Sequence, residues 1–218
     1  MKGLLVKDLK FIMLQKNFFA LILMVVIGMM TFTDDIIFPV AFLCFIVSLF
    51  TVTTISYDDF DNSNMFLFTL PITRHHYVIE KYYLGLLLGG ISWVFATVLG
   101  MMATLFKGTL AITDFIMIAL LILPIMIIIQ VIMIPFQLQF GGDKGRIAMI
   151  GVFGALALIS LIVEKGVKAI FHIDLFQVFN ALSTVSVGVF VVGVIVIALI
   201  ILFVSLKVSL SIINKKEF

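Results

Sequence analysis

The chain has 218 residues, of which 63% are hydrophobic and 12% charged, and its net charge is +2. With a mean hydropathy of +1.32, nearly all of this length is accounted for by membrane segments, so no soluble domain fits. The small net charge and the dispersed basic residues exclude a nucleic-acid-binding surface, and the single cysteine, Cys44, excludes an intrachain disulfide.

Residues 1–16 carry four lysines and are predicted to form an interfacial helix. Leu5, Leu9 and Ile12 fall on one stripe, and the charged residues lie largely elsewhere. A basic amphipathic helix of this kind lies along the inner leaflet of a membrane. It is either a simple anchor or a lever joined to the first span.

Uncharged apolar stretches follow along the chain and predict an all-α, polytopic membrane protein with six transmembrane helices in one domain, residues 1–218. Each stretch is long enough, because about 17–25 apolar residues in a helix cross the hydrocarbon core. None contains an ionisable Asp, Glu, Lys, Arg or His, which argues against an ion or proton carrier. The predicted spans are residues 17–33, 36–57, 82–106, 115–142, 147–163 and 181–206.

Eleven of the 14 Lys and Arg residues lie in alternate connecting segments. By the positive-inside rule, both termini and the segments 58–81 and 143–146 are predicted to be cytoplasmic. The segments 33–35, 107–114 and 164–174 then face outward.

Three spans contain further signals. In the second span, Ser48 and Thr51 lie one turn apart on one face and are candidates for lining a transport pathway, although hydroxyls in helices usually bond to their own backbone. The fourth span contains Pro124 and Pro135, each of which removes a backbone donor and predicts a kink.

The third span opens with glycines at four-residue spacing, Gly85 and Gly89, followed by Gly90, Ala96 and Gly100. Small residues let another helix approach closely, so this face is expected to pack against protein, either within the chain or in a second copy.

The segment 58–81 is too long for a hairpin and too apolar for a solvated linker. Asp58, Asp59 and Asp61 are suited to the positive N-terminus of a short helix that contains an apolar run. A turn at Leu70–Pro71 follows, and Thr73 begins the next helix. An exposed apolar run on this face indicates a binding site.

The same segment offers a weaker metal reading. His75 and His76 follow the three aspartates, but adjacent residues point to different sides of a helix, which argues against joint ligation. Residues 164–180 mix charged and apolar residues and predict short re-entrant pieces before the last span. The chain has no phosphate-loop, dinucleotide-binding or H-E-x-x-H motif, so no catalytic, cofactor-binding or metal residues are predicted.

The stretch Leu70–Tyr82, LPITRHHYVIEKY, lies in the segment 58–81 between the second and third spans, which we call the second loop. Together with the interfacial helix, this structured loop and the short re-entrant pieces before the last span, it resembles the membrane subunits of type-2 ATP-binding-cassette exporters. It is similar to small bacterial permeases that export amphipathic or antimicrobial peptides such as phenol-soluble modulins. The resemblance implies a permease in the bacterial cytoplasmic membrane that pairs with a second copy or a related subunit.

The resemblance also implies two copies of a separate ATPase that binds ATP, and a hydrophobic or amphipathic cargo. It places the ATPase-coupling element in the second loop, with these residues: Asp61, Asn64, Met65, Phe66, Leu67, Phe68, Leu70, Pro71 and Arg74. The alternatives are an exporter of a lipid-linked glycan or a small drug, and a membrane scaffold or sensor that transports nothing.

Overall fold

The computed structural model describes residues 2–59, 69, 72–141 and 187–215. Within these ranges the chain is all helical, without a β-strand. The helices are α1 (Lys2–Leu14), α2 (Lys16–Phe32), α3 (Ile37–Asp59), α5 (Arg74–Lys107), α6 (Ile112–Phe140) and α9 (Val187–Lys215).

Four of these helices, α3, α5, α6 and α9, are long and apolar enough to cross a membrane. The bent pair α1 and α2, which meet at 61°, provides a fifth crossing in the described part of the chain if the pair counts as one span. A multi-pass helical membrane protein is therefore confirmed. The count of six spans stays a prediction, because the span 147–163 and the re-entrant segment 164–180 lie outside the described residues.

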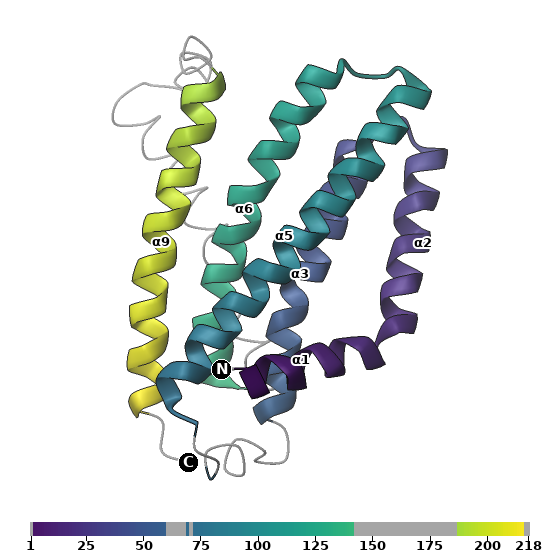
Figure 1. The fold of residues 1–218 in the computed structure, drawn as a ribbon. Coiled ribbons are helices and arrows are strands. Elements are labelled where there is room, and N and C mark those ends of the chain that lie inside the picture. The colour runs from purple at the N-terminus through teal and green to yellow at the C-terminus, as the bar shows by residue number, and fades with distance from the viewer. Residues whose placement is uncertain (1, 60–68, 70–71, 142–186, 216–218) are drawn as a thin grey trace, which may run out of the picture.

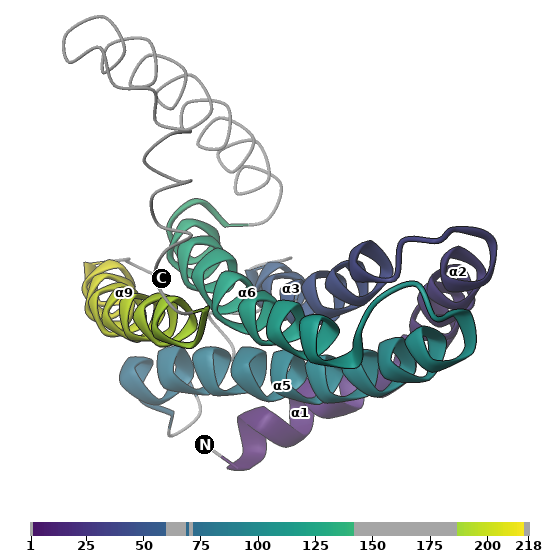
Figure 2. The same ribbon diagram turned by 90° about the horizontal axis from the view of Figure 1, so that it is seen from above.

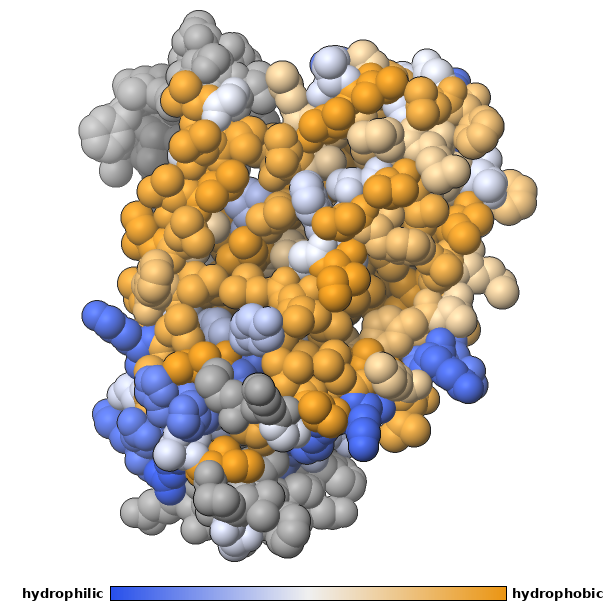
Figure 3. All heavy atoms as spheres, viewed as in Figure 1, coloured by the Kyte–Doolittle hydropathy of each residue, from blue (hydrophilic) through white to orange (hydrophobic). Residues whose placement is uncertain are grey.

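The long helices stand side by side, with α2 at one edge of the bundle and α9 at the other, and α1 crosses one end of it (Figure 1). Seen from above, α3 and α6 lie next to each other on the same side of α5 (Figure 2). Among the described helices, the most extensive contacts are those of α3 with α5 and of α6 with α9. Hydrophilic residues gather at the end that carries α1, and most of the coloured surface beyond this end is apolar (Figure 3).

Several helix boundaries follow from local chemistry. The Asp35 carboxylate accepts the backbone N–H groups of Ile37 and Phe38 and so caps α3. The Thr73 hydroxyl accepts the N–H of His76, which confirms that the helix after the second loop begins here. Gly108 ends α5 with a φ of 62°, in the left-handed region that favours glycine.

The glycine face of α5 packs within the chain. A Cβ on Gly85 would lie 1.3 Å from the Gln130 amide nitrogen of α6, and a Cβ on Gly100 would collide with Phe115. Gly89 is similarly close to α6, whereas a Cβ on Gly90 would meet no atom within 4 Å. The intrachain alternative is therefore confirmed for Gly85, Gly89 and Gly100.

The first helix contacts the bundle through a different face from the predicted stripe. Leu4 and Asp8 are its buried residues, whereas Leu5, Leu9 and Ile12 are only half-buried. The spacing of the apolar residues did not predict this face, because Asp8 lies at its centre. Asp8 is buried here because it forms an ion pair inside the protein.

Candidate functional site

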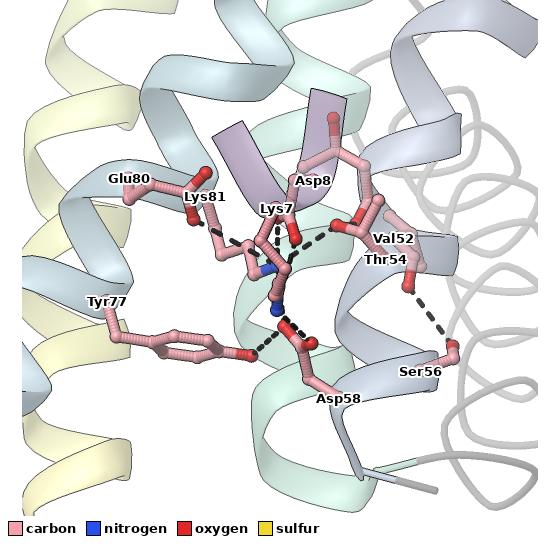
Figure 4. Close-up of polar contacts among 10 residues, drawn as sticks. Lys7, Asp8, Val52, Thr54, Ser56, Asp58, Tyr77, Glu80 and Lys81 are labelled. Atoms are coloured by element: carbon pink, nitrogen blue, oxygen red, sulfur yellow. Dashed lines mark hydrogen bonds and ion pairs between the residues drawn. The ribbon is translucent and has the colours of Figure 1, made fainter. Parts of the chain in front are cut away.

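A buried ion-pair cluster lies where α1 crosses the bundle (Figure 4). Its centre is Lys81 in the second turn of α5, whose side chain is 0% exposed. The Lys81 ammonium pairs with Asp8 of α1, lies 2.7 Å from a carboxylate oxygen of Asp58 of α3, and donates to the Thr54 hydroxyl at 3.1 Å. A buried lysine is tolerated here because three acceptors replace its water shell.

Asp58 joins the same cluster from the last turn of α3. It accepts hydrogen bonds from the ammonium of Lys7 and from the Tyr77 hydroxyl, the latter at 3.1 Å. The prediction that Asp58 serves the N-terminus of a following helix is therefore wrong. A carboxylate at a helix C-terminus faces the negative end of the helix dipole, and the two lysines offset this.

The cluster contains more acidic than basic side chains. Lys7 and Lys81 face three carboxylates, those of Asp8, Asp58 and Glu80. Glu80 is 1% exposed, and its nearest cation is Lys81 at 4.0 Å. Neither Glu80 oxygen accepts a hydrogen bond from the described residues. Lys81 of α5 pairs with both Asp8 of α1 and Asp58 of α3, so its single positive charge links three helices.

The three linked helices are α3 and α5, which anchor the two ends of the second loop, and α1. α3 ends at Asp59 just before the loop, and α5 begins at Arg74 just after it. The Arg74 guanidinium donates to the carbonyls of Ile213 and Asn214, at 3.2 and 3.0 Å, near the end of α9. Both ends of the loop are thus tied to other helices: the cluster links them to α1, and Arg74 links the second to α9.

Of the predicted coupling residues, only Arg74 lies in the described part of the chain. The others, Asp61, Asn64, Met65, Phe66, Leu67, Phe68, Leu70 and Pro71, lie outside the described residues. Their role stays a prediction. The structure shows the two helix ends that flank this segment, Asp59 of α3 and Arg74 of α5.

The two predicted pathway residues are buried where α3 packs against α5 and α6. The Ser48 hydroxyl donates to the Gln130 side-chain oxygen at 3.1 Å, and Thr51 is fully buried beside Gly85. Seven residues after Gln130 on α6, the Gln137 amide donates to the Ser56 hydroxyl of α3 at 2.8 Å. These contacts form a polar seam inside the bundle, and a pathway role for Ser48 and Thr51 stays a prediction.

A second buried polar contact joins α5, α6 and α9 near Pro135. Proline cannot donate to the carbonyl of Val131, one turn earlier, and the Ser205 hydroxyl of α9 donates to this carbonyl at 2.6 Å instead. The Tyr82 hydroxyl bonds to both Ser205 and Ser209. The helix therefore tolerates this proline because a neighbouring helix satisfies the freed carbonyl.

Sequence reasoning missed the ion-pair cluster, although a signal was present. Asp58 directly follows the second predicted span, Lys81 directly precedes the third, and Asp8 is the sole acid within residues 1–16. Opposite charges at the facing ends of adjacent spans lie at a similar depth and are candidates for pairing. In the described part of the chain, no group of three His, Cys, Asp or Glu side chains is placed to hold a metal ion.

Comparison with known families gives one result. A family model described as ABC-2 family transporter protein matches residues 3–214. No curated protein and no solved structure matched the chain. The match covers the helices that build the ion-pair cluster and the second loop between them.

Proposed function

The chain belongs to the ABC-2 family of transporter proteins and is a membrane permease subunit of an ABC transporter, and we propose that it exports a hydrophobic or amphipathic peptide. Permeases of this family work with an ATPase subunit that carries the nucleotide site. We further propose that two ATPase copies serve a pair of permeases, in a bacterial cytoplasmic membrane with both termini of this chain in the cytoplasm.

The observation that carries the coupling part of this proposal is the cluster around Lys81. The proposed docking segment for the ATPase is the part of the second loop that contains the predicted coupling residues, 61–74, and the helices on both sides of it contribute to the cluster through Asp58 and Lys81. Because Asp8 pairs with the same lysine, a force on this segment reaches α1 as well. α1 then acts as a lever rather than a passive anchor.

The proposed cycle is a shift between two arrangements of rigid helices. Closure of the ATPases on ATP displaces the docking segments, and each displacement moves the linked ends of α1, α3 and α5 together. The 61° bend between α1 and α2 converts movement of α1 into tilting of α2. ATP drives the change because the closed ATPases favour one arrangement over the other.

The cargo is proposed on two grounds: the resemblance of Leu70–Tyr82 to small peptide-exporting permeases, and the apolar character of the predicted spans. Flux assays distinguish the alternatives. A fluorescent amphipathic peptide should accumulate in inside-out vesicles that contain the complex and ATP. Accumulation of a small drug or a lipid-linked glycan instead would replace the peptide, and absence of any ATP-dependent flux would favour a scaffold.

The docking segment is tested by the variant Phe66→Ala/Phe68→Ala. Interface energy concentrates in a few apolar anchors whose truncation costs about 2 kcal/mol or more, or about 30-fold in affinity. The variant should insert normally and lose the ATPase on co-purification. Phe106→Ala, which removes an exposed ring at the opposite end of α5, is the matched control. Capture of the ATPase at wild-type yield would contradict the assignment.

A further inference from the structure

An apolar groove lies between α2 and α5. It has a volume of about 320 Å³, and its two side walls are Phe19, Ala20 and Leu23 of α2 and Leu88, Ile91 and Phe95 of α5. Leu43 of α3 contributes to its floor. The volume is at the lower end of the range for small-molecule sites, about 300–1,000 Å³.

The groove is open at the protein surface, and the described residues that line it offer no free polar group to a ligand. Ile91 and Phe95 on its rim are 62% and 48% exposed. Ser92 is the polar residue among those that line it, and its hydroxyl already donates to the Gly89 carbonyl of its own helix at 2.9 Å. An occupant must therefore present a purely apolar chain to this part of the protein.

Lys16 lies at one end of the face of α2 that lines the groove. Lys16 precedes Phe19, Ala20 and Leu23 by three, four and seven residues, which is the spacing of one stripe on a helix. It is exposed, and no carboxylate among the described residues pairs with it. Lys16 is also the last charged residue before the apolar stretch 17–33, so its ammonium lies at the border of the hydrocarbon region.

We propose that this groove binds one acyl chain of an anionic bilayer phospholipid, with the net negative headgroup at Lys16. The apolar walls accommodate the chain, and the lysine one turn beyond Ala20 supplies the charge that an anionic headgroup requires. A bound lipid fills the space between α2 and α5 and thereby supports α2 against the bundle. This site is separate from the ion-pair cluster and does not depend on the identity of the cargo.

Native mass spectrometry of the purified full chain tests the proposal with two added lipids, phosphatidylglycerol and phosphatidylcholine. The wild type should retain one phosphatidylglycerol preferentially. Lys16→Glu should lower that retention by at least about fivefold, since a lysine near the membrane surface contributes about this factor. Lys10→Glu, which changes an exposed lysine outside the stripe, is the control for charge.

A second pair of variants tests the groove itself. Ala20→Trp fills it and should abolish retention, whereas Leu21→Trp places the same side chain at a neighbouring exposed position outside the groove and should leave retention unchanged. Equal retention of the two lipids by the wild type would overturn the proposal. So would full retention in the Ala20→Trp variant, or an Ala20→Trp effect confined to the oligomeric state, which would place a second copy of the chain in the groove.

Discussion

Replacing Lys81 by methionine removes the central charge of the cluster while keeping an unbranched side chain. The ammonium lies 2.7 Å from Asp58, a separation at which the direct attraction is about 6 kcal/mol with an effective dielectric constant of about 20. Desolvation of the buried ions offsets part of this attraction, and deletion of one partner of a buried pair costs about 3–5 kcal/mol. Lys81→Met leaves Asp8 and Asp58 with the half-exposed Lys7 as their remaining cation.

The loss should fall on the docking of α1. A cost of about 3 kcal/mol raises the undocked population about 100-fold. The assay is maleimide labelling of Leu4→Cys, a position that is 3% exposed, in a Cys44→Ala background. The cysteine should react slowly with Lys81 intact and much faster with Lys81→Met.

Lys10→Met is the matched control, because it removes an exposed lysine of the same helix. The double variant Asp58→Asn/Lys81→Met should cost less than the sum of its single changes, since the two residues share one interaction. Equal labelling of Leu4→Cys with and without Lys81 would refute the view that Lys81 holds α1 against the bundle.

Two further predictions concern topology and packing. In a cysteine-free background, a cysteine at Asp34 should react with an impermeant reagent added outside intact cells, and a cysteine at Asn64 should not; external labelling of Asn64 would reverse the orientation. Gly85→Ala should lower the melting temperature markedly, because its Cβ would collide with the Gln130 amide. Gly90→Ala should leave the melting temperature nearly unchanged, because its Cβ would meet no other atom within 4 Å. Equal effects of the two changes in a thermal-shift assay would contradict the packing of α5 against α6.

The parts of the fold that are local in sequence were predictable. Helices over most of the apolar stretches followed from their length and lack of charge, and the helix start at Thr73 followed from its capping hydroxyl. The glycine spacing around Gly85 predicted a close helix contact. Each of these signals lies within one element, so it does not depend on which elements become neighbours.

The candidate site required tertiary information. The partners Asp8, Asp58 and Lys81 are far apart in the chain, and their pairing depends on the angle at which α1 crosses the bundle. The role of Asp58 was misassigned because an aspartate before an apolar run also fits a helix start. The buried face of α1 was missed because apolar periodicity cannot distinguish an aspartate in an ion pair from one in water.

The measurement that tests transmission through the cluster most directly uses a spin label on α1, at Lys10→Cys in a Cys44→Ala background, in the complex with its ATPase. A non-hydrolysable ATP analogue should change the label spectrum when Asp8 is present. In the double variant Lys7→Met/Asp8→Asn the ATPase should still co-purify and bind nucleotide, but the spectral change should be lost, because both ion pairs that link α1 to α3 and α5 are removed. An undiminished spectral change in Lys7→Met/Asp8→Asn would contradict the coupling of the second loop to α1 through this cluster.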